Sequence, residues 1–389
     1  MKKSALAGVF KKNAMLIVLV LVYLFFMVLT QGGIFNPSSF SELINQNAYV
    51  YILGAGMLMC MLTGGNIDLS CGAFVCLLGA FGGVFMIIMG LGTGVSILLM
   101  LLIGIVYGVV LGFLISYVHI PPWIATLAGY LAFRGLGTSI LSANSKTGSL
   151  APFPVDFQRI FYGRVFPTEK GVFNWPCFLF GVLAALCVIL VIFRTRQNRL
   201  SKGYEADSLK NAVLKCVIGC AAILLVMTKL SLDGGIPTTL LWVAGIILIY
   251  SFITSKTTIG RHFYVVGGNM EAARLSGVNT RRIMFLAYLN MAVLTSIAAM
   301  TVVARSQSAY ADVGKNFEMD AISACVVGGV SASGGAGTVL GMVIGATLIG
   351  VINLGMSLIS LDANYQRVIK GFVLLAAVVF DILSKKRSS

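Results

Sequence analysis

Residues Ile259–Arg282 carry the sequence IGRHFYVVGGNMEAARLSGVNTRR, a polar segment in a very apolar chain. Asn269 suits the N-cap of a helix, because its side-chain oxygen can accept a hydrogen bond from a free backbone N–H. Glu271 falls in the first turn and Arg274 near the other end, where their charges match the helix dipole. Gly277 stands where a C′ glycine can take the left-handed conformation that ends a helix. The pattern predicts a short helix with a cap at each end.

This predicted helix has about seven residues and a length of roughly 10 Å, at ~1.5 Å per residue. It is too short to cross a membrane and too short to be stable alone in water. A small apolar face is available for a partner, and it comprises Ala272, Ala273, Leu275 and Val278. An ordinary capped loop between two spans is the simpler interpretation, and a docking helix for another protein is the functional one.

The composition is that of a membrane protein. Hydrophobic residues make up 58% of the 389 residues and charged residues 11%, and the mean hydropathy is +0.95. Such values exclude an ordinary soluble domain. We expect an all-α fold, a polytopic inner-membrane helical bundle with about 10–12 membrane-embedded helices, some of them broken or re-entrant.

The net charge of +15 has its origin in basic residues at the ends of the apolar runs. In a soluble protein this charge would suggest nucleic acid, but here the positive-inside bias of membrane proteins explains it, and we expect no nucleic-acid partner. The same bias predicts that both termini are cytoplasmic. The clusters placed on the cytoplasmic side are Lys2–Lys12, Arg194–Lys210, Lys256–Arg282 and Lys385–Arg387.

We expect one membrane domain over residues 1–389. Residues 142–174 are polar and rich in proline and aromatic residues, and they are predicted to form an external loop. Residues 194–212 form a basic loop and residues 255–282 a second loop, both predicted to be cytoplasmic.

The sequence offers no catalytic or metal-binding group. Most of the eight cysteines lie inside apolar runs, no CxxC is present, and two histidines do not give a metal-site spacing. Buried, reduced thiols are therefore expected. Because we find no nucleophile, base and orienting group together, we expect neither an enzyme nor a bound cofactor or metal.

A polar break interrupts the apolar sequence between Leu62 and Cys71. The segment Thr63–Ser70 contains two glycines, and Asp68 and Ser70 lie at its end. Irregular backbone at membrane depth is tolerated only when protein or a water-filled cavity surrounds it. Asp68 and Ser70 are therefore candidates for a translocation path, and the alternative is that Asp68 merely caps the following helix.

A comparable break follows in the second half of the chain. Asp320 precedes a short apolar run, Gly328 and Gly329 end that run, and the glycine-rich segment 331–337 follows. No lysine stands in the spacing of a phosphate-binding loop, so a nucleotide site is not expected. We interpret the two breaks as a weak internal repeat, and we place Asp320, Gly328 and Gly329 on the predicted path.

Two further features of the apolar runs concern helix packing and a charged residue. Gly104, Gly108 and Gly112 recur every four residues and predict close approach of another helix. Arg134 lies in an apolar span, where it must extend its charged end to the interface or meet an anion. We expect Arg134 to extend its charged end to the interface.

Several of these motifs resemble one family. Glu271-Ala272-Ala273 followed by Gly277 resembles the EAA loop in permease subunits of ATP-binding-cassette importers. The longer segment from Gly267 to Val278 resembles the loop of ribose, xylose and multiple-monosaccharide permeases. Further matches are Gly-Gly-(x)-Ile-Asp-Leu-Ser ending at Ser70 (with Asn66 inserted), Ile120–Leu127, Phe317–Ile322, Val326–Gly329 and Gly334-Gly335.

The resemblance covers about Gly54–Ile140 and Ile259–Leu383. The two spans that precede the predicted loop of residues 255–282 are similar to those of the xylose and multiple-monosaccharide subgroup. It implies a bacterial cytoplasmic-membrane permease that imports a monosaccharide such as xylose, galactose or glucose. It also implies three protein partners: a cytoplasmic ATPase subunit that uses ATP, an extracellular or periplasmic sugar-binding protein, and a second copy of this chain. The residues expected to couple to the ATPase are Gly267, Gly268, Asn269, Glu271, Ala272, Ala273, Arg274, Leu275, Ser276 and Gly277.

Two alternatives remain open. One is a self-sufficient secondary transporter or channel, which would need carboxylates at membrane depth, and Asp68, Asp320 and Asp381 are the plausible acids. The other is a permease of the same importer class for a nucleoside or an amino acid.

Overall fold

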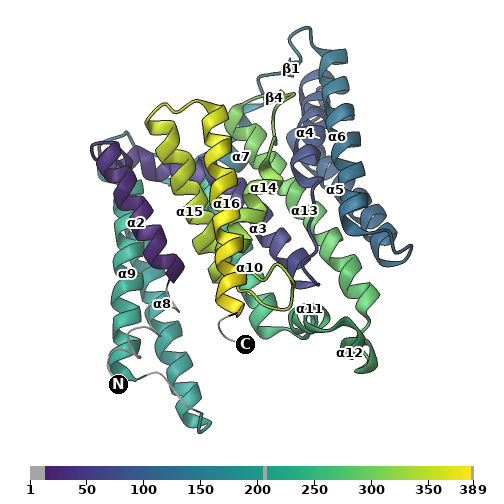
Figure 1. Ribbon diagram of the computed structural model, residues 1–389. Coiled ribbons are helices and arrows are strands. Elements are labelled where there is room, and N and C mark those ends of the chain that lie inside the picture. Colours follow the sequence, from purple (N-terminus) through teal and green to yellow (C-terminus); the bar gives the residue numbers. More distant parts are fainter. Residues whose placement is uncertain (1–13, 205–207, 387–389) are drawn as a thin grey trace.

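The computed structural model describes residues 14–204 and 208–386, which form a helical bundle (Figure 1). The helices of the first half are α2 (Ala14–Leu29), α3 (Pro37–Leu62), α4 (Cys71–Gly83), α5 (Thr93–Ser116), α6 (Pro122–Asn144), α7 (Val155–Tyr162) and α8 (Trp175–Ser201). Those of the second half are α9 (Leu209–Leu232), α10 (Thr238–Lys256), α11 (Thr258–Gly268), α12 (Met270–Leu275), α13 (Thr280–Ser306), α14 (Phe317–Val327), α15 (Val339–Leu358) and α16 (Ala363–Lys386). A 3₁₀ turn, Gly33–Phe35, precedes α3, and a π-helical segment, Val84–Ile88, extends α4.

Four two-residue strands form two small antiparallel ladders. β1 (Ser149–Leu150) pairs with β4 (Ala309–Tyr310), and β2 (Arg164–Val165) pairs with β3 (Ile236–Pro237). The predicted all-α polytopic bundle is confirmed, since these short strands are the only β-structure among the described residues.

Eight of the described helices are long and apolar enough to cross a membrane: α4 with its π-helical extension, α5, α6, α8, α9, α10, α13 and α15. Helix α2 is apolar but shorter, and α3 carries Asn45, Gln46 and Asn47 in its first half. Because α2 contacts α15 and α16 contacts α14, these helices belong to the same bundle as the eight.

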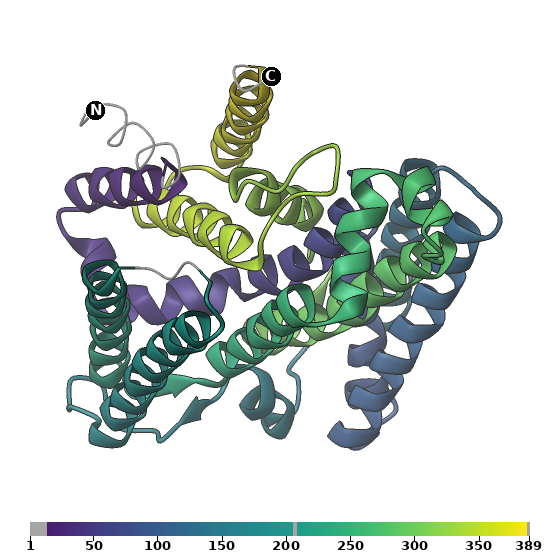
Figure 2. The ribbon, with the colours of Figure 1, turned by 90° about the horizontal axis from the view of Figure 1, so that it is seen from below.

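Helix α3 forms the centre of the molecule. From Ala48 to Leu62 nearly every side chain is buried, and α3 contacts α10, α13, α14 and α15. Figure 2 shows α3 crossing the middle of the bundle. A helix that is apolar on all sides is expected to be enclosed in this way.

The glycine stripe predicted on α5 brings α5 and α13 close together. A Cβ at Gly108 would lie 2.9 Å from Leu289 Cα, and one at Gly112 would lie 3.0 Å from the Phe285 carbonyl oxygen. A Cβ at Gly104 would overlap the Ser296 hydroxyl. The prediction of close helix approach is confirmed.

Three segments predicted as loops contain regular structure. Residues 142–174 include the end of α6, β1, α7 and β2, because α7 has an apolar face that buries Phe157 and Phe161. Residues 255–282 contain α12, the short helix predicted there, together with α11, which was not predicted, and α8 continues through the basic run to Ser201. Polarity alone had suggested loops, but polar residues also occupy exposed helix faces.

Arg134 does not extend to the interface as expected. Its Nη1 donates hydrogen bonds to the carbonyl oxygens of Ala311 (2.9 Å) and Val313 (2.8 Å), in the loop before α14. These two acceptors hold Nη1 within the protein, whereas Nη2 is buried and has no hydrogen-bond partner among the described residues.

The bundle has two distinct ends in Figure 1. Strands β1 and β4 lie at one end, and α11, α12 and the C-terminal end of α8 lie at the other. The segments predicted to be external and cytoplasmic are therefore at opposite ends of the molecule.

Candidate functional site

Helix α12 is the short capped helix that the sequence predicts. The Asn269 side chain accepts a hydrogen bond from the Ala272 N–H at 2.9 Å, and Gly277 has a φ of +83°. Glu271 and Arg274 form an exposed ion pair at 3.5 Å. The caps satisfy the backbone groups that a six-residue helix leaves free at its ends.

The apolar residues of α12 do not form a single face, which corrects the prediction. Ala273 is fully buried against the bundle, whereas the side chain of Leu275 is 84% exposed and Ala272 is also exposed. The helix therefore uses Ala273 to attach to its own chain and leaves Leu275 on the surface. Gly268, Asn269, Ser276 and Gly277 are exposed as well.

A cavity of about 610 Å³ adjoins α12 and the end of α5. It is lined by Met270, Glu271, Gly277, His119 and Met284, among others. An exposed helix beside a cavity of this size is a suitable docking surface for a protein partner.

Helix α11 ends where the two broken segments meet. Gly267 packs directly on the Leu62 carbonyl oxygen, which a Cβ there would overlap. The Gly335 N–H donates a hydrogen bond to the same oxygen at 3.2 Å. Gly334 lies against Gly64, again backbone to backbone.

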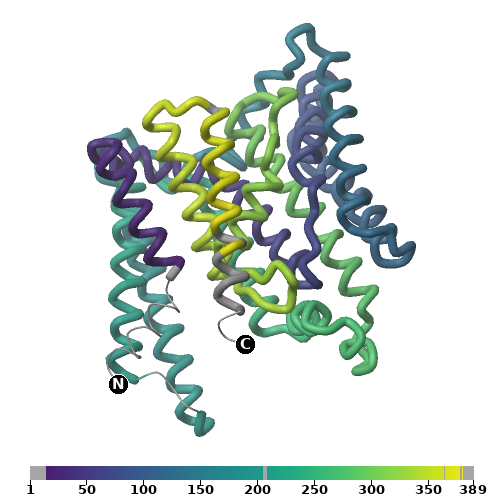
Figure 3. The backbone as a smooth tube through the Cα atoms, viewed as in Figure 1, coloured from purple at the N-terminus to yellow at the C-terminus, as the bar shows by residue number. Residues whose placement is uncertain are grey.

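We call this contact the glycine junction, and it consists of Leu62–Gly65, Gly267 and residues 332–335. Figure 3 shows the loop after α14 running down to α11. Tyr264 on α11 adds a hydrogen bond from its hydroxyl to the Gly337 carbonyl oxygen at 3.0 Å. Gly267 contacts both breaks, and Asn269, two residues later, is the N-cap of α12. A displacement of α12 can therefore be transmitted directly to both breaks.

Asp68 organises the first break. Its carboxylate accepts hydrogen bonds from the Ser70 N–H (2.8 Å) and the Ser70 hydroxyl (2.5 Å), and it is 1% exposed. The Tyr107 hydroxyl lies 2.6 Å from Ser70 Oγ and donates to it, since the Ser70 proton is already used. Asp68 thus fixes the turn that leads into α4, but the N-cap residue of α4 is Ser70 and no side chain makes a capping hydrogen bond there. The role of Asp68 in a path stays a prediction.

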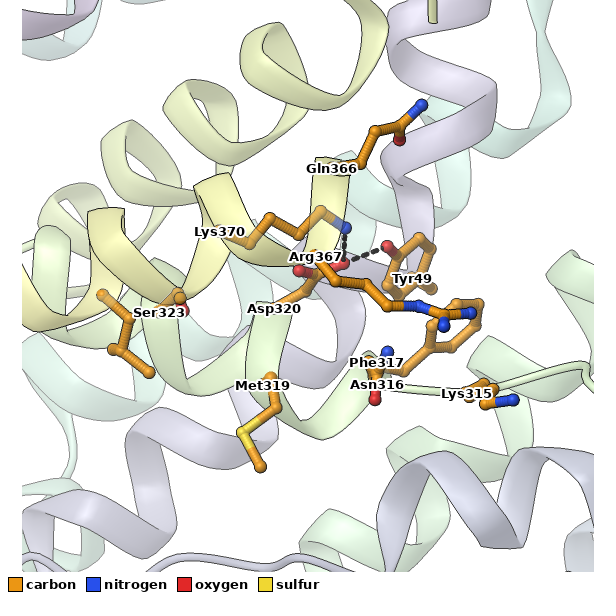
Figure 4. A pocket seen from close by; sticks show the side chains of 12 residues that line it. Tyr49, Lys315, Asn316, Phe317, Met319, Asp320, Ser323, Gln366, Arg367 and Lys370 are labelled. Atoms are coloured by element: carbon orange, nitrogen blue, oxygen red, sulfur yellow. Dashed lines mark hydrogen bonds and ion pairs between the residues drawn. The ribbon is translucent and has the colours of Figure 1, made fainter. Parts of the chain in front are cut away.

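Asp320 lies in a different setting. Its carboxylate accepts a hydrogen bond from the Tyr49 hydroxyl at 2.5 Å and forms an ion pair with Lys370 at 2.9 Å. The Tyr49 and Phe317 rings stack with centroids 3.6 Å apart. These groups line a cavity of about 400 Å³ between α3, α14 and α16, which also holds Arg367 (Figure 4).

Asp320 is not located at the second break, contrary to the prediction. It occupies the first turn of α14, where a carboxylate suits the helix dipole, and the helix continues to Val327. The break begins at Gly328 and Gly329, and Gly329 has a φ of +83°. The two acids are therefore not equivalent, although the two breaks do contact one another.

The sequence did not identify Tyr49, Glu318 and Lys370. Glu318 is 4% exposed and lies against Gly72 on α4, where a side chain would overlap its carboxylate. Lys370 was the available signal, since a lysine within an apolar run of a membrane protein needs a partner. Among the described residues, no group of three His, Cys, Asp or Glu side chains is placed to hold a metal ion.

The bundle has two breaks in its helices, buried charged groups beside a cavity and a short exposed helix. Together these features are typical of a membrane transport protein. The family model described as "Branched-chain amino acid transport system / permease component" matches residues 39–378. The chain belongs to this family of permease components, as the resemblance indicated.

Named relatives extend over almost the whole chain. It is 32% identical over 374 residues to the xylose transport system permease protein XylH of Haemophilus influenzae, covering 96% of each chain. It is 30% identical to XylH of Escherichia coli K12 (96% of this chain, 92% of the relative) and 28% identical to the E. coli K12 ribose import permease protein RbsC (89% and 86%). No solved structure matches the chain.

Proposed function

We propose that this chain is the membrane-spanning permease subunit of an ATP-binding-cassette importer that moves a monosaccharide into the cytoplasm. The observation that carries the proposal is the similarity to xylose permeases over 96% of the chain, including both breaks and α12. The family assignment makes the chain a permease component, and we assign ATP hydrolysis to a separate subunit.

We assign docking of the ATPase to α12 and its flanks, Gly267–Asn269 and Glu271–Gly277. The exposed Leu275, Glu271 and Arg274 give this surface an apolar centre with charges beside it. Interfaces commonly combine an apolar anchor with a polar rim. The glycine junction then connects the docked helix to both breaks.

We assign the translocation path to the region of the two breaks and the Asp320 cavity, with Asp68, Ser70, Asp320, Gly328 and Gly329. Aromatic rings beside hydrogen-bonding groups suit a sugar, which has apolar C–H faces and many hydroxyls. The cavity of about 400 Å³ falls within the ~300–1,000 Å³ typical of small-molecule sites.

The remaining partners follow from the importer class. We propose a second copy of this chain in the membrane and an external sugar-binding protein at the end that carries β1 and β4. Both termini and α12 are then cytoplasmic, in a bacterial cytoplasmic membrane.

One observation favours a second candidate substrate. The family description names branched-chain amino acids, whereas the named relatives transport xylose, ribose and galactose. An apolar amino acid would need an apolar pocket, but the Asp320 cavity contains three cations and a carboxylate. The cavity therefore favours a hydroxylated substrate.

Uptake of labelled substrates tests the proposal. Cells with the gene and cells from which it is deleted are compared for uptake of D-xylose, D-ribose, D-galactose and L-leucine at equal external concentration. We expect loss of one or more sugars upon deletion. Loss of leucine uptake with all sugars unchanged would contradict the proposal.

A further inference from the structure

A second polar cavity lies at the end of the bundle opposite α12. It has a volume of about 320 Å³, is open to the surface, and is lined by the first turns of α3, the end of α7 with β2, the turn after α9, and the end of α15. The side chains that matter here are Ser41, Glu42, Asn45, Tyr162, Arg164 and Asp233. The volume is at the lower end of the ~300–1,000 Å³ range for small-molecule sites.

Both carboxylates of this cavity already have cationic partners. Asp233 is 4% exposed and pairs with Arg164 at 2.6 Å and with Lys170 at 3.6 Å. Glu42 pairs with Arg305 on α13. Burial raises the pKa of Asp233, but the nearby Ser41 hydroxyl and the charges of Arg164 and Lys170 outweigh burial and lower the pKa. A charged ligand would have to break these pairs, so the site favours a neutral one.

Neutral groups of the cavity lack partners. Asn45 Oδ1 is buried and makes no hydrogen bond. Ser41 is 3% exposed, and its hydroxyl is directed to Asp233, whose pKa it lowers, so that the lone pairs of its oxygen are the part without a partner. The two residues are four apart on α3 and therefore lie on one face of the helix. Because a buried polar group without a partner is unfavourable, these atoms are prepared for a ligand that donates and accepts hydrogen bonds.

We propose that this cavity is an entry site that binds a neutral, polyhydroxylated molecule, with Asn45 and Ser41 receiving its hydroxyl groups before it reaches the Asp320 cavity. The inference rests on the proposed sugar transport and adds a site to it. An amide and a hydroxyl one helical turn apart can bond adjacent hydroxyls of one sugar ring. Tyr162 supplies an aromatic side chain at the same cavity.

Binding of tritiated D-xylose to the purified permease in lipid nanodiscs tests the inference. The variants are Asn45→Leu, Asn45→Ala and Ser41→Ala, and Gln46→Leu is the matched control, since Gln46 is adjacent on α3 and does not line the cavity. Loss of one neutral hydrogen bond should weaken binding about five- to tenfold. Gln46→Leu should leave binding unchanged, and D-glucuronate, an anion, should compete poorly.

Uptake by the assembled importer separates this inference from the proposed function. If the wild type takes up D-xylose but all three variants bind it as the wild type does, the entry site is refuted and the importer stands. Stronger competition by glucuronate than by unlabelled D-xylose would refute the claim that the site prefers a neutral ligand. If the wild-type importer takes up no sugar, the proposed function itself has failed. Elution of each variant as the wild type does on gel filtration shows that it is folded.

Discussion

Asp320 is a buried carboxylate whose negative charge is balanced by Lys370. Its carboxylate is 4% exposed on the side chain, and one oxygen serves both the Tyr49 hydroxyl and the Lys370 ammonium group. Buried pairs of this kind contribute little net stability, but removal of one partner leaves an uncompensated charge. Asp320 and Lys370 are therefore expected to depend on one another.

Asp320→Asn should destabilise the protein and reduce transport, because Lys370 loses its counter-ion. Since the Lys370 side chain is 25% exposed, water compensates in part, and we expect about 1–3 kcal/mol, below the value for a fully buried pair. Thermal unfolding in nanodiscs measures the effect. The double variant Asp320→Asn/Lys370→Met removes both charges and should regain most of the lost stability. A double variant that is no more stable than Asp320→Asn would contradict the claim that the charges of Asp320 and Lys370 depend on one another.

At this scale the sequence indicated the acids but not their partners. Asp68 and Asp320 were visible as carboxylates in apolar surroundings. Tyr49 is 271 residues from Asp320 along the chain, and nothing in a tyrosine within an apolar run indicates which acid it meets. Such long-range pairs are set by helix packing, which one sequence does not specify.

Helix α12 was predicted best, because its caps are local. The N-cap, the first-turn acid and the C′ glycine depend on residues within one or two turns of each other. Its attachment was predicted less well, since burial of Ala273 and exposure of Leu275 depend on where α12 lies against α13. The glycine junction was not predicted, because it joins three distant segments.

The end of α12 gives a test of coupling. Gly277 has a φ of +83°, and a Cβ added there would have no heavy atom within 4 Å, so a substitution strains only the backbone. Gly277→Val should cost about 1–2 kcal/mol locally and reduce transport and stimulation of the ATPase, while membrane insertion persists. Gly277→Asn should retain activity, because asparagine tolerates this conformation. Full transport by Gly277→Val would show that this turn is not needed for coupling.

The glycine junction gives a second test at the same scale. Gly267→Ala places a methyl group against the Leu62 carbonyl, and overpacking of this kind costs about 1–3 kcal/mol. We expect the breaks to separate from α11, so that ATP hydrolysis continues while sugar uptake falls. Gly245→Ala in α10 is the matched control, because no heavy atom lies within 4 Å of its added methyl group and it is outside the proposed docking surface. The ratio of sugar transported to ATP hydrolysed is the measurement, and equal ratios for the two variants would contradict a coupling role.

The whole molecule predicts a definite orientation in the membrane. Ser149 in β1 and Ser201 at the end of α8 lie at opposite ends of the bundle. Cysteines introduced at these positions, with the exposed Cys187 replaced, should react with an impermeant thiol reagent in intact cells only at position 149. Labelling of both positions from outside would overturn the arrangement of the termini and of α12.

The sequence was sufficient to predict a polytopic membrane protein, because hydropathy is averaged over whole spans and basic residues cluster at the ends of the spans. The arrangement of the helices was not, because lipid-facing and protein-facing apolar residues look alike in sequence. Helix α3 shows this, since its enclosed position follows from its contacts with α9, α10, α11, α13, α14 and α15.

The central claim is that ATP hydrolysed by a partner docked on α12 drives sugar import. Proteoliposomes that contain the permease, its ATPase and its binding protein can be loaded with D-xylose-free buffer and a fixed ATP concentration, and an uncoupler can then collapse the proton gradient. We predict that accumulation of labelled D-xylose continues at the same rate with the gradient collapsed and stops when ATP is replaced by a non-hydrolysable analogue. Accumulation that stops with the gradient alone, while ATP stays constant, would contradict the account.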